Sequence, residues 1–181
     1  FHWHLTDEPA WRIEIKQFPK LTTIGAQGNY TNPNAVVKFY SQEEIKEVVA
    51  YAKERFIDII PEIDMPGHAT AANKAYPEFS GGGSEKHPEY TFNPGIEATY
   101  SHLSKILTEV ASLFPYDYIH IGGDEVSFGN EKWSTNDSIL SLMKKNNLSS
   151  LVEVEHYFVK RIGDSIKNLN KKYVIEDIVW I

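Results

Sequence analysis

The sequence contains no cysteine and no long apolar run. Without cysteine, disulfides, thiolate zinc sites and cysteine nucleophiles are excluded within these 181 residues. No apolar segment approaches the roughly 18 residues that cross a bilayer, so we expect no membrane span. Positive charge is also scarce: the formal net charge of −7 argues against nucleic acid or an anionic membrane as the main partner. What remains is the composition of an ordinary globular domain, or of part of a larger one.

The most informative stretch is residues 118–126, where an apolar run leads into two glycines and then two carboxylates. The apolar part predicts a buried strand of a parallel sheet. Asp124 and Glu125 would then stand at its carboxyl end, where α/β folds bind ligands. Two adjacent carboxylates cannot both ionise freely, so we expect a raised pKa for at least one, as a general acid needs. The alternative is that Asp124 caps the next helix and Glu125 is solvated.

Two further predicted strands also end on carboxylates. Residues 1–7 are strand-like and end at Asp7, and residues 57–64 end at Asp64, although a proline inside the second disfavours a central strand. His68 follows a Met-Pro-Gly turn after that strand, a position that favours a functional histidine. In a barrel, consecutive strand ends converge on one site, whereas in an open doubly wound sheet they do not.

Alternation places His2 and His4 on one face of the first strand. Two imidazoles on one face can hold a metal ion. The favoured interpretation is two hydrogen-bonded histidines that line a polar interior. Trp11, in the predicted loop that follows, is either a sugar platform or a lid over the core, and the sequence leaves both open.

Helices are predicted between the strands. Ser41 and Glu44 form a capping box that starts a helix through about residue 55. Further helices are predicted at residues 96–114, 136–145 and 150–170, a fourth strand from residue 173, and long loops at 25–41 and 77–95. Strands that alternate with helices form a parallel sheet. We therefore predict an α/β fold, a TIM-type barrel of which this chain holds about four β/α units.

Three segments together resemble the family 20 glycoside hydrolases, the β-N-acetylhexosaminidases. They are FHWHLTDEPAWRIEI, IIPEIDMPGHA and YIHIGGDEV, in this order. The resemblance implies a (β/α)8 barrel, with residues 1–181 as part of a single catalytic barrel whose N- and C-terminal portions are missing. It implies retaining exo-hydrolysis of terminal β-linked N-acetylglucosamine or N-acetylgalactosamine from oligosaccharides or glycoconjugates, with no cofactor and no metal. It also implies an extracytoplasmic location (periplasmic, secreted or lysosome-like) for the full-length protein.

The same resemblance implies a role for each candidate residue. Glu125 is the general acid, and then the base that activates water. Asp124 orients the substrate's 2-acetamido group, which acts as the nucleophile in place of a protein carboxylate. Asp7 and His68 match positions beside the acid that tune or orient it, and Asp64 matches a supporting carboxylate near the sugar.

The chain also departs from the family pattern. The family's sugar-gripping arginine would precede Phe1. Near residue 175 the family usually has Gly-Trp-Asp-Glu, and Trp180 lies too far along to replace that tryptophan. Phe56 stands where a glycine commonly ends the helix. Two alternatives therefore stay open: a non-catalytic sugar-binding fragment, and a metal-dependent barrel hydrolase that uses His2, His4 and His68.

Overall fold

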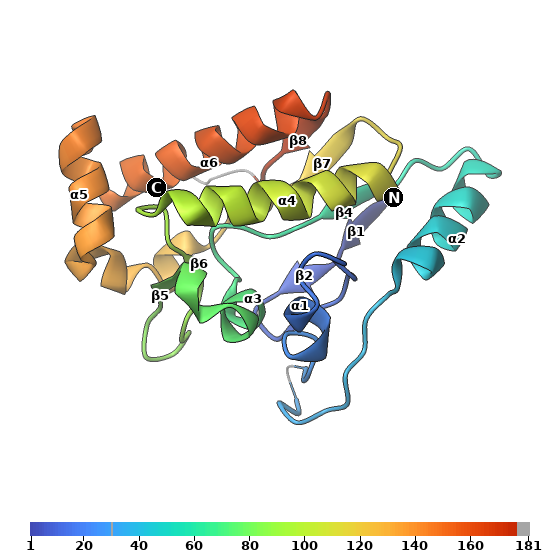
Figure 1. The fold of residues 1–181 in the computed structure, drawn as a ribbon, viewed down its shortest axis with the longest axis horizontal. Helices are drawn as coiled ribbons and strands as arrows, with labels where there is room; N and C mark the ends of the chain where they lie inside the picture. Colours follow the sequence, from blue (N-terminus) through green and yellow to red (C-terminus); the bar gives the residue numbers. More distant parts are fainter. Residues whose placement is uncertain (30, 177–181) are drawn as a thin grey trace.

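A four-stranded parallel sheet is the centre of the structure, a computed structural model that describes residues 1–29 and 31–176. Its strands are β1 (His2–His4), β4 (Ile60–Glu62), β7 (Tyr118–His120) and β8 (Lys172–Val174). They follow one another in space in the order in which they occur in the chain. This order, with a helical crossover between neighbours, is the arrangement of a barrel arc (Figure 1). Trp180 lies outside the described residues.

Three long helices connect these strands: α2 (Gln42–Lys53), α4 (Glu97–Leu113) and α6 (Leu151–Asn168). Helix α4 packs against both α2 and α6, so the helices form an outer layer in the same order as the strands (Figure 1). The shorter elements are α1 (Lys20–Thr23), α3 (Thr70–Ala75), α5 (Asp137–Asn146) and the 3-10 turns η1 (Pro77–Phe79), η2 (Val126–Phe128) and η3 (Glu131–Thr135). In the described part of the chain, no helix combines the length and the apolarity needed to cross a bilayer.

The predicted capping box at the start of α2 is confirmed. The Ser41 hydroxyl accepts a hydrogen bond from the Glu44 N–H, and the Glu44 carboxylate accepts one from the Ser41 N–H at 2.7 Å. Ile45 is fully buried as expected, but Val48, also predicted to face the sheet, is 38% exposed. Just beyond the helix, Phe56 has a φ of 58°, the left-handed conformation that glycine adopts most easily.

The main core lies between the sheet and the long helices. Leu103 and Ile106 of α4 and Ile162 of α6 are fully buried against Ile119 of β7 and its neighbours. Trp11 belongs to this core: it is 2% exposed, and its indole N–H donates to the Ile13 carbonyl at 2.6 Å. Of the two roles left open for Trp11, the lid over the core is therefore correct and the sugar platform is wrong.

Two small hairpins depart from the sequence prediction. The predicted first strand divides after β1, because β2 (Thr6–Asp7) turns away to pair with β3 (Ala10–Trp11). The predicted loop at 77–95 contains a second hairpin, β5 (Ser80–Gly82) with β6 (Thr91–Phe92).

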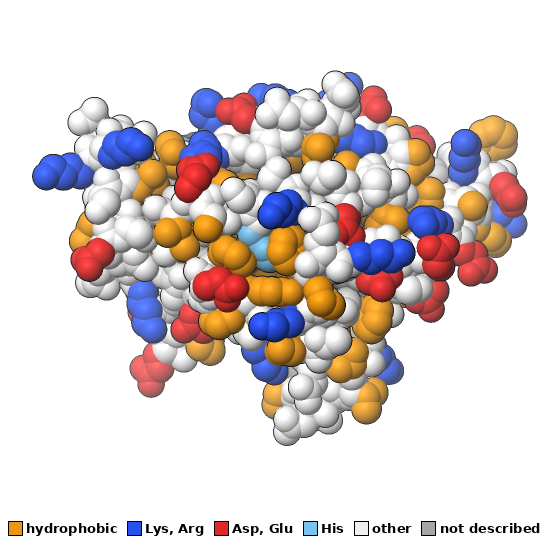
Figure 2. All heavy atoms as spheres, in the orientation of Figure 1, with side chains coloured by type: hydrophobic (Ala, Val, Ile, Leu, Met, Phe, Trp, Pro, Cys, Tyr) orange, Lys and Arg blue, Asp and Glu red, His pale blue; other side chains and the backbone are white. Residues whose placement is uncertain are grey.

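Basic and acidic side chains are interspersed on the face in Figure 2, with hydrophobic ones gathered near its middle.

The predicted second strand is also shorter than expected, because only Ile60–Glu62 is regular strand. Pro61 is tolerated inside it, since β4 pairs with β7 only at Glu62 and no bond to β7 is needed at the proline. Beyond the strand, the Ile63 and Met65 N–H groups still donate to the carbonyls of His120 and Ile121. The backbone thus stays aligned with β7 as far as the carboxylates.

Candidate active site

The imidazole of His68 lies among three carboxylates. Its Nδ1 is 3.0 Å from Oδ1 of Asp7. On its other side, Nε2 lies 3.5 Å from Oδ2 of Asp124 and 3.5 Å from Oε2 of Glu125. Residues that follow three different strands therefore meet at one rim of the sheet, as the sequence predicts.

The charges at this rim stabilise one another. Burial alone would lower the pKa of His68, but the nearby carboxylates of Asp124 and Asp7 outweigh it and raise the pKa to about 10. The His68 imidazolium, 3.5 Å away, in turn holds the pKa of Asp124 below its usual value. At neutral pH, His68 is therefore an imidazolium and Asp124 a carboxylate.

We expected a raised pKa for at least one carboxylate of the pair, and Asp124 is not that carboxylate. The positive charge of His68 offsets the repulsion between neighbouring carboxylates, and the sequence alone does not place that charge. The alternative role for Asp124 as a helix cap is not found either. Glu125 occupies the position before η2, with a φ of 50°, and no side chain caps that turn.

Asp64 lies beneath the Gly-Gly turn that carries the pair. It is 4% exposed, and burial raises its pKa to about 6. Its Oδ2 is 3.4 Å from Nε2 of His4, and this carboxylate raises the pKa of His4 to about 9. A Cβ on Gly122, which has a φ of 66°, would lie 1.8 Å from Oδ1 of Asp64. Glycine at position 122 therefore allows Asp64 to sit directly behind the turn.

The histidines of β1 lie on one face, as predicted, and both contact carboxylates. Buried Glu62 has its Oε2 2.6 Å from His2 Nε2 and its Oε1 3.0 Å from His120 Nδ1. Burial would raise the pKa of Glu62, but His120, His4 and His2 outweigh it and lower the pKa. These contacts support the interpretation that the histidines pair with polar groups, but the side chains of His2 and His4 are 46% and 47% exposed and do not lie in an interior.

Four groups in the described residues have three metal-ligating side chains with ligand atoms within 4.8 Å of one another. They are His2, Glu62 and His120; His4, Glu62 and Asp64; Asp7, Asp64 and His68; and His68, Asp124 and Glu125. Within this described part, no such group unites His2 or His4 with His68. The structure therefore does not assemble the three-histidine site of the metal-hydrolase alternative.

Two further buried residues, Tyr90 and Glu62, lie beside this rim and were not among the predicted site residues. Tyr90 is fully buried, its ring centroid lies 5.0 Å from that of His68, and its hydroxyl has no hydrogen-bond partner. Glu62 anchors the histidines of two strands. Tyr90 comes from the predicted loop at 77–95, where no periodic pattern marks it. Glu62 alternates with the apolar residues of its strand, and that alternation could have indicated its inward position.

Residues 1–180 match the glycosyl hydrolase family 20 catalytic domain. This chain belongs to that family. The beta-hexosaminidases of Vibrio furnissii and Porphyromonas gingivalis are 39% and 37% identical to it, each over 96% of the chain. The chain spans only 31% and 23% of these two relatives, respectively.

Solved structures of family 20 enzymes have the same fold. An exo beta-N-acetylglucosaminidase from Vibrio harveyi, in complex with N-acetylglucosamine, superposes with a TM-score of 0.87 at 37% identity. The alignment covers 97% of this chain and 30% of that one. The beta-N-acetylhexosaminidase of Bacteroides fragilis gives a TM-score of 0.85 at 40% identity, over 97% and 35%. The four parallel strands and their helices are thus part of the family's (β/α)8 barrel, which confirms the predicted fold.

Proposed function

We propose that the protein containing this chain is a retaining exo-β-N-acetylhexosaminidase that uses the substrate's 2-acetamido group as its nucleophile. The observation that carries the proposal is the joint position of Asp124, Glu125 and His68 at the strand ends. It adds to the family membership of the chain. We also propose that residues 1–181 are one part of a longer catalytic barrel, and that the whole protein acts outside the cytoplasm.

Glu125 is the proton donor in this proposal. It protonates the glycosidic oxygen as the bond breaks, and afterwards takes a proton from the attacking water. The carboxylate left behind after the first step faces the His68 imidazolium at 3.5 Å. That positive charge stabilises the deprotonated form of Glu125 at the moment when it develops.

Asp124 acts on the nucleophile. Its lowered pKa keeps it ionised, so it can accept a hydrogen bond from the acetamido N–H. The acetamido carbonyl oxygen then attacks the anomeric carbon, and Asp124 stabilises the positive charge that spreads onto the resulting oxazolinium ring. A nucleophile that belongs to the substrate is already in place, which lowers the barrier by proximity.

Asp7 and His68 are positioning residues in this scheme. Asp7 holds Nδ1 of His68 and directs Nε2 at the carboxylates of Asp124 and Glu125. Asp64, buried behind Gly122, supports the turn that carries both of them. Together these contacts fix the two carboxylates before the substrate arrives.

The test is hydrolysis by the full-length protein of an aryl β-N-acetylglucosaminide and of the matching aryl β-glucoside, which lacks the acetamido group. We expect turnover of the first with retention at the anomeric carbon, and almost none of the second. Comparable cleavage of both would contradict the proposal. Sugar binding without any turnover would favour the non-catalytic alternative instead.

A further inference from the structure

The hydroxyl group of Tyr90 is buried without a partner beside the proposed active site. Tyr90 is fully buried, and among residues 1–29 and 31–176 its hydroxyl oxygen has no hydrogen-bond partner. A buried hydroxyl that makes no hydrogen bond destabilises the folded protein, and phenylalanine would fill the same space without that penalty. An unpaired group next to an active site therefore needs an explanation, and a partner that arrives during the reaction is one.

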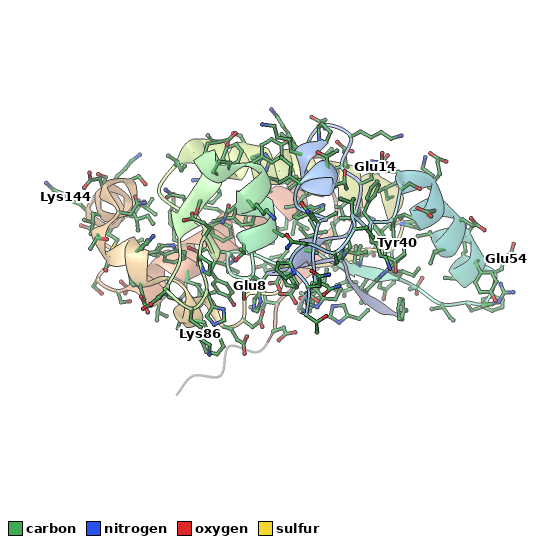
Figure 3. All side chains as sticks on the ribbon, turned by 90° about the horizontal axis from the view of Figure 1, so that it is seen from below. Glu8, Glu14, Tyr40, Glu54, Lys86 and Lys144 are labelled. Carbon is green, nitrogen blue, oxygen red and sulfur yellow. The ribbon has the colours of Figure 1, made fainter. Side chains whose placement is uncertain are left out.

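The segment that carries Tyr90 is tied to the turn that carries His68. The Tyr90 carbonyl accepts a hydrogen bond at 2.8 Å from the N–H of the residue after His68, and the two ring centroids lie 5.0 Å apart. On the other side, the Tyr90 ring centroid is 5.3 Å from that of His87, whose Nδ1 lies 2.9 Å from Oε2 of Glu8. In Figure 3, Glu8 lies near the middle of the protein and Lys86, the residue before His87, lies near its lower edge. The Tyr90 ring is thus fixed from both sides.

The Tyr90 hydroxyl lies close to the backbone of Asp124, with Gly67 between them. A Cβ on Gly67 would lie 3.6 Å from the hydroxyl and 3.2 Å from the Asp124 carbonyl oxygen, so both oxygens flank the same point. Glycine keeps a side chain out of that point and does not separate the hydroxyl from the carboxylate pair. The electrostatics agree with this placement: burial raises the pKa of Tyr90, and the negative charges of Glu125 and then Asp124 raise it further.

Glu125 can serve as the acceptor for two buried donors that lack one. Its side chain is 49% exposed and lies, at Oε2, 3.5 Å from Nε2 of His68. That distance exceeds the range of about 2.7 to 3.2 Å for an N–H···O hydrogen bond, and Nε2 has no hydrogen-bond partner in the described part of the chain. Hydrogen bonds of catalytic groups are often long in free enzymes and tighten when substrate binds. Both Nε2 and the Tyr90 hydroxyl are thus available to a carboxylate that turns inward.

We propose that Tyr90 is a positioning residue, whose hydroxyl donates a hydrogen bond to the Glu125 carboxylate that forms when the glycosidic oxygen is protonated. The proposal rests on the proposed function. In that step the proton moves from Glu125 to the glycosidic oxygen, the bond from that oxygen to the anomeric carbon breaks, and the acetamido oxygen bonds to the same carbon. The proton of Tyr90 stays on its own oxygen. Because the hydrogen bond strengthens as Glu125 becomes negative, it stabilises the transition state more than the bound substrate.

Tyr90→Phe in the full-length protein tests this, because it removes the hydroxyl and keeps the ring. Activity is compared as kcat/KM for phenyl β-N-acetylglucosaminide, whose leaving group needs a proton, and for its dinitrophenyl analogue, which needs little protonation. We expect kcat/KM to fall about tenfold to hundredfold with the phenyl substrate and less than about threefold with the dinitrophenyl substrate. The melting temperature should stay the same or rise, since the free protein loses no hydrogen bond.

Tyr100→Phe is the matched control on α4. Tyr100 is also buried, at 5% exposed, but its hydroxyl donates a hydrogen bond to the Pro94 carbonyl at 2.9 Å. Removal of this hydroxyl leaves a buried carbonyl unpaired, so the melting temperature is expected to fall. The ratio of kcat/KM for the phenyl substrate to kcat/KM for the dinitrophenyl substrate should not change.

A fall in melting temperature for Tyr90→Phe, like that of Tyr100→Phe, would show that the hydroxyl is already paired in the free protein and would overturn the proposal. An equal loss of kcat/KM with both substrates, or no loss with either, would overturn it as well. If the unaltered protein hydrolyses the dinitrophenyl substrate with retention, the proposed function stands whatever Tyr90→Phe does. If it hydrolyses neither substrate, the proposed function fails, and the role of Tyr90 fails with it.

Discussion

A Cβ on Gly122 would lie 1.8 Å from Oδ1 of Asp64. The two residues come from neighbouring strands, and together they determine the path of the turn that leads into Asp124. The two sequence motifs that identify the family thus depend on each other sterically. One motif supplies the buried carboxylate of Asp64. The other supplies Gly122, which has no side chain and so leaves room for that carboxylate.

Gly122→Ala is therefore expected to destabilise the protein by about 4 kcal/mol or more, because a buried clash is added to backbone strain. Gly123→Ala is the matched control. Its φ of 94° is also strained, but its Cβ would meet nothing closer than Ile175 at 3.8 Å. We expect a cost of only about 1 to 2 kcal/mol there. Thermal or denaturant unfolding of both variants tests this, and equal losses would contradict it.

Asp7→Asn removes one of the carboxylates that raise the pKa of His68. The imidazolium should then lose its proton at a lower pH than the unaltered value of about 10. We expect lower kcat/KM and an alkaline limb of the pH–rate profile that shifts toward neutral pH. Glu78→Gln, an exposed carboxylate on η1, is the control. A profile unchanged in shape would show that Asp7 does not act through His68.

His102 of α4 gives a separate prediction about stability. It is 3% exposed, neither ring nitrogen has a hydrogen-bond partner, and its ring centroid lies 4.1 Å from those of Phe18 and Phe79. Burial lowers its pKa from 6.5 to about 4. Between these values the unfolded chain binds a proton that the folded protein does not, so His102 makes stability fall as pH falls.

His102→Leu removes this contribution. The free energy of unfolding of the variant should depend less on pH between pH 6.5 and pH 4, by at most about 3 kcal/mol across that window. His4 and His68 act in the opposite sense: their raised pKa values contribute stability that is fully present below pH 6.5 and is lost as the pH rises toward 9 and 10. If the free energy of unfolding depended on pH in the same way in the variant and in the unaltered protein, the contribution assigned to His102 would be refuted.

The grouping of the site residues at one rim of the sheet was predictable, because it follows from the order of the strands. Asp7, Asp64 and Asp124 each come just after an apolar run, and consecutive parallel strands of a barrel place such residues together. The capping box at Ser41 and Glu44 was predictable for a similar reason, since both partners lie within one turn of helix. Patterns that depend on neighbouring residues or on strand alternation can be recognised in a single sequence.

Contacts between distant segments were not predictable in this way. The pKa of Asp124 depends on His68, which reaches it from the turn after another strand. Trp11 is buried because the hairpin of β2 and β3 folds it inward, and no periodicity marks that hairpin. Tyr90 meets His68 only because the segment at 77–95 closes over the rim.

The most direct test of the account separates the roles of Asp124 and Glu125 in the full-length enzyme, with substrates that have good and poor leaving groups. Glu125→Gln should impair a poor leaving group far more than an activated aryl group, which needs little protonation. Asp124→Asn should impair both alike, by about 10² to 10³ in rate, because it weakens attack by the acetamido group whatever leaves. Equal sensitivity of the two substrates to Glu125→Gln, or a covalent sugar ester trapped on Asp124, would contradict the mechanism.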